Sequence, residues 1–187
     1  TLLYRIVPLV SMNEVGGGPG RKIGGTADFH PRMSRRKDSH PFAMITTATH
    51  DTKRSEDVRG RISVLSELPE RWAEHVDRWQ VLNRRARIDV KGSTCPSSRD
   101  EYLFYQTLLG VWPHFADETE EWPAGALTEM RKRVEAYMIK ASREAKIHTS
   151  WLNPDEDYES GLRNFVSRVI EGQAAPPFLR DFDAFAR

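Results

Sequence analysis

A group of ionisable side chains follows a short apolar run in the first third of the chain. His50, Asp51 and Lys53 lie within four positions, directly after the run from Phe42 to Ala48. This run is brief and nearly unalternating, which is typical of a buried parallel strand. In β/α barrels the carboxyl ends of the strands carry the chemistry, so a carboxylate and two cationic donors here could surround a substrate. The alternative is a charged turn that only begins the next helix, and the spacing alone favours neither.

Two other patterns suggest anion or nucleic-acid binding but lack the required features. The glycine-rich stretch at 16–20 contains neither G-x-x-x-x-G-K-[ST] nor G-x-G-x-x-G, so it predicts a surface loop and not a phosphate site. The basic clusters at 32–37 and 84–91 have no interleaved aromatic residues. They predict solvated faces, and we expect no nucleic-acid partner.

The histidines and the cysteine do not form a metal-binding pattern. His30, His40 and His50 are ten residues apart, and no H-x-x-x-H pair occurs. The one cysteine, Cys95, excludes both an internal disulfide and a cysteine cluster, and it favours a reducing compartment. We therefore expect no metal, no cofactor and a cytoplasmic location.

The composition is that of an ordinary globular protein. The 187 residues are 39% hydrophobic and 29% charged, which is enough for one domain with an apolar core. The formal net charge is +1, whereas proteins that mainly hold nucleic acid are usually more basic. No run of 18 apolar residues occurs, so no membrane-spanning segment is expected.

The hydrophobic pattern divides the chain into unequal parts. Residues 1–54 are rich in glycine, proline, threonine and serine, with a long loop before the strand expected near 42–48. Residues 55–172 carry apolar positions at steps of three and four, which predicts about five helices in a bundle. Residues 173–187 follow as a C-terminal tail. The pattern therefore predicts a mainly α chain.

Several helix starts in this bundle have recognisable signals. Pro69 suits a first helical position, Ser98 and Glu101 form a capping-box pattern, and Asn153 is a cap candidate before a proline and acids. The apolar stripe of the helix after Pro69 is expected in the core and contains Trp72, Val76 and Trp79.

The polar cluster and its surroundings resemble the malto-oligosyltrehalose synthases, a family in the α-amylase superfamily (glycoside hydrolase family 13). Residues 49–59, THDTKRSEDVR, resemble this family's form of the fourth superfamily motif, which follows the seventh barrel strand. Residues 11–17 resemble the segment before that strand. Residues 65–69, 101–108 and 137–151 resemble the family's helical subdomain. The similarity covers nearly the whole chain, and the long HDTKRSED match is far more specific than a bare His-Asp pair.

The resemblance implies a fold class and a reaction. The fold would be mainly α: a helical subdomain bundle, 55–172, with a short remnant of a (β/α)8 barrel at 1–54. The reaction would be an intramolecular transglucosylation that turns the reducing-end α-1,4 bond of a maltooligosaccharide into an α,α-1,1 bond. By the same resemblance, Asp51 matches the carboxylate that stabilises the transition state. His50 and Lys53 match residues that bind the sugar.

The resemblance also implies that essential parts of such an enzyme are missing. Retaining enzymes of this kind use two carboxyls about 5–5.5 Å apart. The family's nucleophile and general acid belong to motifs that would precede residue 1. We therefore expect an internal fragment that is inactive alone, with maltooligosaccharide as the substrate of the full-length enzyme. Self-association through the exposed barrel strand is also expected. The alternative is a stand-alone helical interaction module with a vestigial active-site segment.

Overall fold

The computed structural model is mainly helical over the residues it describes, which are 2–14, 24–113, 123–173 and 175–187. The glycine-rich stretch at 16–20 and Trp122 lie outside these residues. The α-helices are α1 (Leu2–Arg5), α2 (Thr26–Ser39), α3 (Glu56–Val64), α4 (Pro69–Leu82), α5 (Ser98–Val111), α6 (Ala126–Ala145), α7 (Glu156–Glu171) and α8 (Ala175–Ala186). Three 3-10 turns are η1 (Val10–Met12), η2 (Leu65–Glu67) and η3 (Arg84–Ala86), and two strands are β1 (Ile88–Val90) and β2 (Ser93–Cys95). The expectation of a mainly α chain is confirmed.

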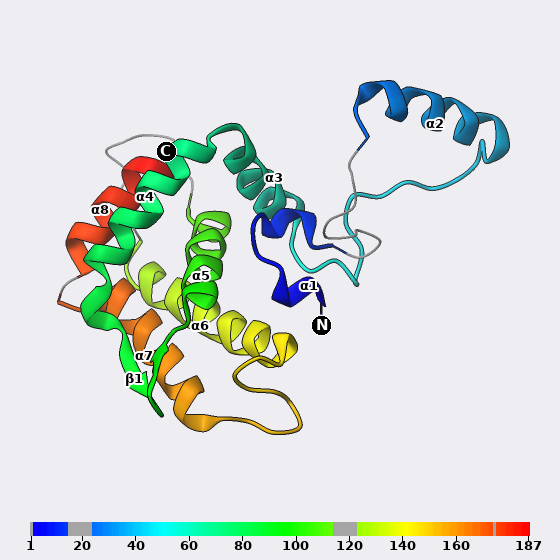
Figure 1. Cartoon of the computed structure of the whole chain (residues 1–187). Helices are drawn as coiled ribbons and strands as arrows, with labels where there is room; N and C mark the ends of the chain where they lie inside the picture. Colours follow the sequence, from blue (N-terminus) through cyan, green and yellow to red (C-terminus); the bar gives the residue numbers. More distant parts are fainter. Residues whose placement is uncertain (1, 15–23, 114–122, 174) are drawn as a thin grey trace.

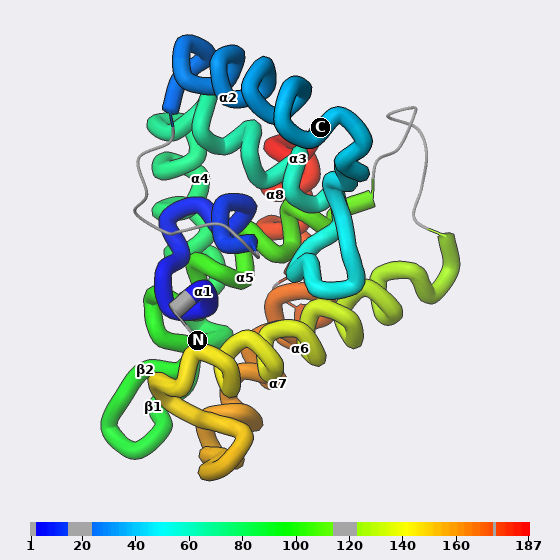
Figure 2. Tube along the Cα trace, turned by 90° about the vertical axis from the view of Figure 1, so that its right-hand side faces the viewer, coloured from blue at the N-terminus to red at the C-terminus, as the bar shows by residue number. Residues whose placement is uncertain are grey.

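The later helices pack into one bundle. Helix α6 lies along α7, α5 packs against both α3 and α6, and α8 packs against α4 and α7. Figure 1 shows these helices gathered on one side with α6 next to α7, and Figure 2 shows α6 passing in front of α7. The short N-terminal helix α1 contacts α6, so the first residues of the chain belong to the bundle rather than to the loop that follows them.

An aromatic cluster forms the centre of the core. Trp79 is fully buried, and its ring centroid lies 5.5 Å from that of Trp72 and 5.3 Å from that of Tyr105. The expectation that the two tryptophans are core residues is confirmed. The cluster also includes Phe178 and Phe182 of α8, both fully buried. The segment expected as a C-terminal tail is therefore a packed helix, because its aromatic residues bury apolar surface against α4 and α5.

Helix starts were predicted to within one or two residues. Pro69 stands in the first turn of α4 as expected. Helix α5 is capped by Ser97 and not Ser98, since the Ser97 hydroxyl accepts a hydrogen bond from the Asp100 backbone N–H at 3.3 Å. Helix α7 is capped by Asp155, whose carboxylate accepts from the Tyr158 N–H at 3.1 Å, and not by Asn153.

Residues 88–95, within the part predicted as helical, form a small antiparallel hairpin between α4 and α5. Ile88 pairs with Cys95 and Val90 with Ser93. The turn is at Lys91 and Gly92, which both have positive φ. The hairpin lies against α7, where a Cβ on Gly161 would stand 2.8 Å from the Cys95 Sγ, so glycine is needed for this close approach.

Two features of the N-terminal part of this chain differ from what the sequence predicts. Residues 42–48 form no strand and are exposed coil, although Phe42 and Met44 are apolar. A strand needs a partner for its backbone N–H and C=O groups, and no neighbouring strand is available among the described residues. The loop expected before this run contains the helix α2, which has no buried residue and projects away from the bundle in Figure 1. Its sequence has no apolar stripe, so periodicity could not reveal it.

Candidate functional site

His50, Asp51 and Lys53 lie together on the turn that precedes α3. The His50 Nε2 stands 3.4 Å from an Asp51 carboxylate oxygen, and the Lys53 Nζ donates to the Asp51 backbone carbonyl at 3.1 Å. The side chains of His50 and Asp51 are 90% and 65% exposed. The turn therefore presents a carboxylate, an imidazole and an ammonium on one open surface. We call residues 49–54 the polar turn.

Local hydrogen bonds from Thr49 shape the polar turn. The Thr49 hydroxyl accepts from the Asp51 N–H at 3.2 Å, and the Thr49 carbonyl accepts from the Thr52 N–H at 3.1 Å and from its hydroxyl at 2.7 Å. Threonine side chains commonly close turns in this way. The sequence T-H-D-T therefore favours a turn at this point even without distant partners.

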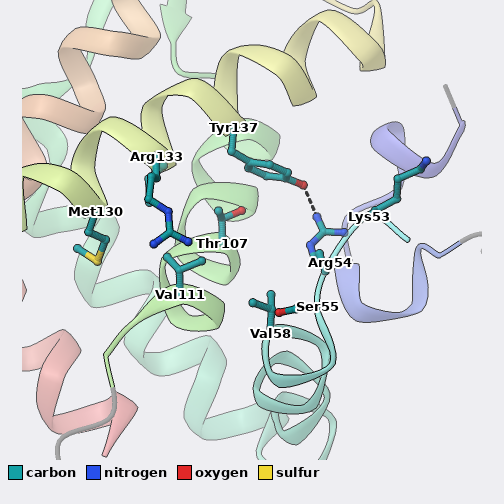
Figure 3. A pocket seen from close by; sticks show the side chains of 10 residues that line it. Lys53, Arg54, Ser55, Val58, Thr107, Val111, Met130, Arg133 and Tyr137 are labelled. Atoms are coloured by element: carbon teal, nitrogen blue, oxygen red, sulfur yellow. Dashed lines mark hydrogen bonds between the residues drawn. The ribbon is translucent and has the colours of Figure 1, made fainter. Parts of the chain in front are cut away.

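Distant residues hold the end of the polar turn. Both carboxylate oxygens of Glu14 accept the Lys53 N–H at 2.8 Å, and one of them accepts the Arg54 N–H at 3.3 Å. The Arg54 guanidinium donates to the Val10 carbonyl at 3.2 Å and to the Tyr137 hydroxyl. It also lies 5.5 Å from the Tyr137 ring centroid. Figure 3 shows this hydrogen bond between the turn and α6.

Burial raises the pKa of the Tyr137 hydroxyl, and the nearby Arg54 charge partly opposes that shift. The phenol is therefore neutral around pH 7, and its oxygen can accept a hydrogen bond from the guanidinium. A neutral partner leaves the positive charge of Arg54 uncompensated on this side. The contact orients the guanidinium without cancelling its charge.

A cavity of about 270 Å³ adjoins the polar turn, between α3, α5 and α6. Figure 3 shows Arg133 of α6 and Thr107 of α5 facing this space. The apolar part of the lining comes from Val58, Val111, Met130 and Val134, and the rest from Tyr137 and residues 53–55. The cavity therefore lies behind the turn, on the bundle side.

The described part of the chain contains no group of three or more His, Cys, Asp or Glu side chains that could hold a metal ion. None of its helices is long and apolar enough to cross a membrane. The available chemistry at the polar turn is that of one exposed carboxylate beside two nitrogen groups. Such a group can stabilise positive charge and hold hydroxyls.

Sequence reasoning did not identify Glu14, Arg54 or Tyr137 as parts of the site. Glu14 was noted within the segment similar to the family, and Arg54 within the polar motif, but neither was given a role. The hydrogen bond from Arg54 to Tyr137 joins residues 83 positions apart. No spacing signal in one sequence reveals such a pair.

Comparison with known proteins shows that the chain is similar to part of the maltooligosyl trehalose synthases. No protein-family model matches it. A Mycobacterium tuberculosis protein assigned as a maltooligosyl trehalose synthase is 37% identical over 174 residues, which is 93% of this chain, and the same match is found in two strains. The chain spans about one fifth of the length of these curated relatives, since the match covers 20% of each.

Solved structures of the same class of enzyme superpose on the whole chain. A crystal structure of a maltooligosyl trehalose synthase has a TM-score of 0.80 at 33% identity and covers 100% of this chain and 22% of its own. The Arthrobacter ramosus maltooligosyltrehalose synthase has a TM-score of 0.76 at 32% identity and covers 98% of this chain and 21% of its own. The chain thus matches, in sequence and in fold, one segment of the maltooligosyl trehalose synthases. The resemblance seen in the sequence is confirmed.

Proposed function

We propose that the chain is part of a trehalose-forming intramolecular transglucosylase of the α-amylase superfamily. Its substrate would be a maltooligosaccharide, whose reducing-end α-1,4 bond becomes an α,α-1,1 bond. The observation that carries this proposal is the 37% identity over 93% of the chain to a protein assigned as such a synthase. A cytoplasmic location fits a protein with a single, buried and unpaired cysteine.

Asp51 is proposed as the carboxylate that stabilises the oxocarbenium-like transition state. His50 and Lys53 are proposed to hold sugar hydroxyls beside it. The exposure of the Asp51 carboxylate and its closeness to His50 support these roles, since a substrate can reach both groups. A fixed negative charge near the anomeric carbon would lower the barrier, because positive charge develops there.

Residues 1–54 are proposed as a barrel segment of the longer enzyme. The apolar side chains of Phe42, Met44 and Ile45 are 95%, 98% and 71% exposed. In an extended strand Phe42 and Met44 would share one face and Ile45 the other, as expected for a strand covered on both sides. Barrel partners would bury these side chains and satisfy the backbone groups. The same exposed run would also promote self-association of the isolated chain.

The 187-residue chain alone is proposed to be inactive. A retaining mechanism needs a nucleophile and a general acid besides Asp51, and these would come from other segments of the enzyme. Incubation with maltopentaose should therefore give no loss of reducing sugar above a blank. Measurable turnover by the purified chain would contradict the proposal.

Asp51→Asn in the full-length enzyme tests the site itself. This variant keeps the size of the side chain and removes the charge. We expect kcat to fall at least about a hundredfold, with a much smaller change in KM, because losing a preorganised electrostatic group costs roughly 2.7–4 kcal/mol of transition-state stabilisation. If Asp51 only supports the turn before α3, the asparagine variant will turn over within a few-fold of wild type.

A second candidate is a stand-alone helical interaction module. The favouring observation is that the helices α3 to α8 share one continuous hydrophobic core. The coding frame separates the two candidates. Upstream sequence with barrel strands bearing an Asp and a Glu supports the enzyme, whereas a start codon directly before Thr1 supports the module.

A further inference from the structure

Glu14 binds the backbone of the polar turn. Its carboxylate accepts hydrogen bonds from the consecutive backbone N–H groups of Lys53, at 2.8 Å, and Arg54, at 3.3 Å. Glu14 precedes these two residues by 39 and 40 positions in the chain. Hydrogen bonds from N–H groups to an ionised carboxylate are about twice as strong as neutral ones. Because two adjacent peptide groups are fixed, the direction in which the chain leaves Asp51 is fixed as well.

The residues just before these two peptide groups have few other restraints. The segment from Thr46 to Asp51 is exposed apart from the half-buried Ala48. Its hydrogen bonds are local ones, mostly at Thr46 and Thr49, apart from one that the Arg59 guanidinium of α3 donates to the Thr47 carbonyl. Segments with few buried contacts open at low free-energy cost. Without Glu14, the carboxylate of Asp51 would sample many orientations.

The helical bundle supplies the second restraint, through Arg54. The Arg54 guanidinium joins the Val10 carbonyl of the N-terminal segment to the Tyr137 hydroxyl of α6. Val10 is itself held to α5, because its N–H donates to the Gln106 side chain at 2.9 Å. Figure 3 shows Arg54 between the turn and α6. The turn is thus attached to two helices of the bundle through one side chain.

We propose that Glu14, together with the Arg54–Tyr137 contact, positions the polar turn for catalysis. We call these three residues the clamp. This inference rests on the proposed role of Asp51. Clamp residues touch no substrate in this scheme and act only through Asp51 and its neighbours. Misplacing a reacting group by about 1 Å can cost on the order of a hundredfold in rate, so the clamp determines turnover more than substrate affinity.

The test uses the full-length enzyme with Glu14→Gln and Tyr137→Phe. Glu14→Gln removes the charge and replaces one acceptor oxygen by an amide NH2, which cannot accept a hydrogen bond from a backbone N–H. Tyr137→Phe removes only the hydroxyl. We expect Glu14→Gln to lower kcat at least about tenfold with KM within about threefold of wild type, and Tyr137→Phe to lower kcat about threefold. The matched control is Glu74→Gln, since Glu74 is an exposed carboxylate on α4, and its kcat should not change.

A double variant separates positioning from a general loss of structure. If Glu14 acts through Asp51, Glu14→Gln should lower kcat less than about twofold when Asp51 is already Asn. Equal losses in both backgrounds, or a wild-type kcat for Glu14→Gln, would overturn the proposal. If Glu14→Gln does not fold, the same comparison with Tyr137→Phe decides.

Amide hydrogen exchange of the full-length enzyme gives a readout that is independent of activity. The peptide covering 49–55 should exchange at least about tenfold faster in Glu14→Gln, while the peptides of α7 keep their wild-type rates. Unchanged exchange at 49–55 would overturn the proposal even if kcat fell. Should Asp51→Asn retain its turnover, the catalytic assignment fails and the catalytic role of the clamp fails with it. Faster exchange would then still show that Glu14 holds the turn.

Discussion

Neutralising Glu159 should destabilise the helical bundle more than neutralising an exposed carboxylate. The side chain of Glu159 on α7 is 1% exposed, and its oxygens accept from Arg143 at 2.7 and 2.6 Å and from Thr149 at 2.7 Å. Arg163 adds a longer contact at 3.4 Å. These bonds join α6, the loop after it and α7 at one carboxylate.

Glu159→Gln keeps one acceptor oxygen but turns an amide N–H toward the second N–H of Arg143. One charge-assisted hydrogen bond is lost, which costs roughly 1.5–3 kcal/mol. We use about 2 kcal/mol for Glu159, because the partly exposed Arg143 can still reach water. At a urea m-value of about 2 kcal/mol per molar, the unfolding midpoint should fall by about 1 M. Glu74→Gln, an exposed change on α4, should leave the midpoint within about 0.25 M, as expected for surface substitutions within about 0.5 kcal/mol.

The pH dependence of this difference has a definite sign. The hydrogen bonds from Arg143 hold the pKa of Glu159 below its usual value, against the opposing effect of burial, and Thr149 adds to the lowering. The stabilisation is therefore complete above the carboxyl's usual pKa and is lost as the pH falls through the lower, folded pKa. Urea titrations at pH 7 and near pH 3 should show the gap between wild type and Glu159→Gln closing in acid. An equal midpoint at pH 7, or a gap independent of pH, would refute this account of Glu159.

Three further predictions address packing, substrate binding and thiol reactivity. Gly110→Ala should lower the free energy of unfolding by about 1–3 kcal/mol, because the new Cβ would lie 2.7 Å from a methyl of Val58. Gly60→Ala, in open space on α3, should raise the free energy of unfolding by about 0.5–1 kcal/mol. Equal urea midpoints for the Gly110→Ala and Gly60→Ala variants would contradict the packing of α3 on α5. In the full-length enzyme, Lys53→Met should raise KM more than it lowers kcat in initial-rate kinetics, and the reverse balance would contradict hydroxyl binding. Burial raises the pKa of the Cys95 thiol to about 12, so iodoacetamide at pH 8 should label it in urea but not in the native chain, and rapid native labelling would show that the thiol is accessible.

The bundle was predictable because helices such as α4 and α7 each bury one apolar stripe. Steps of three and four residues identify α4 and α7, and the stripe through Trp72 and Trp79 indicates which face is inside. Helix α5 was found from its apolar positions, although its cap was assigned one residue late. The hairpin at 88–95 was missed, since three-residue strands are too short to show alternation.

The N-terminal part was predicted less well for a different reason. The apolar run that starts at Phe42 predicts burial but does not specify which segment covers it. Among the described residues, the strands β1 and β2 pair with each other and not with this run. Helix α2 has no apolar stripe to bury, so its local preference is the only signal. Both features depend on surroundings that a single segment of sequence does not specify.

The chemistry available at the polar turn follows from the local sequence alone. His50, Asp51 and Lys53 follow an apolar run and precede a helix, and Thr49 provides local turn bonds, so their closeness is a short-range property. The contacts that hold this turn arise from the tertiary fold, because Glu14 lies 39 positions away from Lys53 and Tyr137 lies 83 positions away from Arg54. The Arg54–Tyr137 pair meets only after α6 has packed into the bundle. The energy of each contact is local, but its existence depends on the whole core.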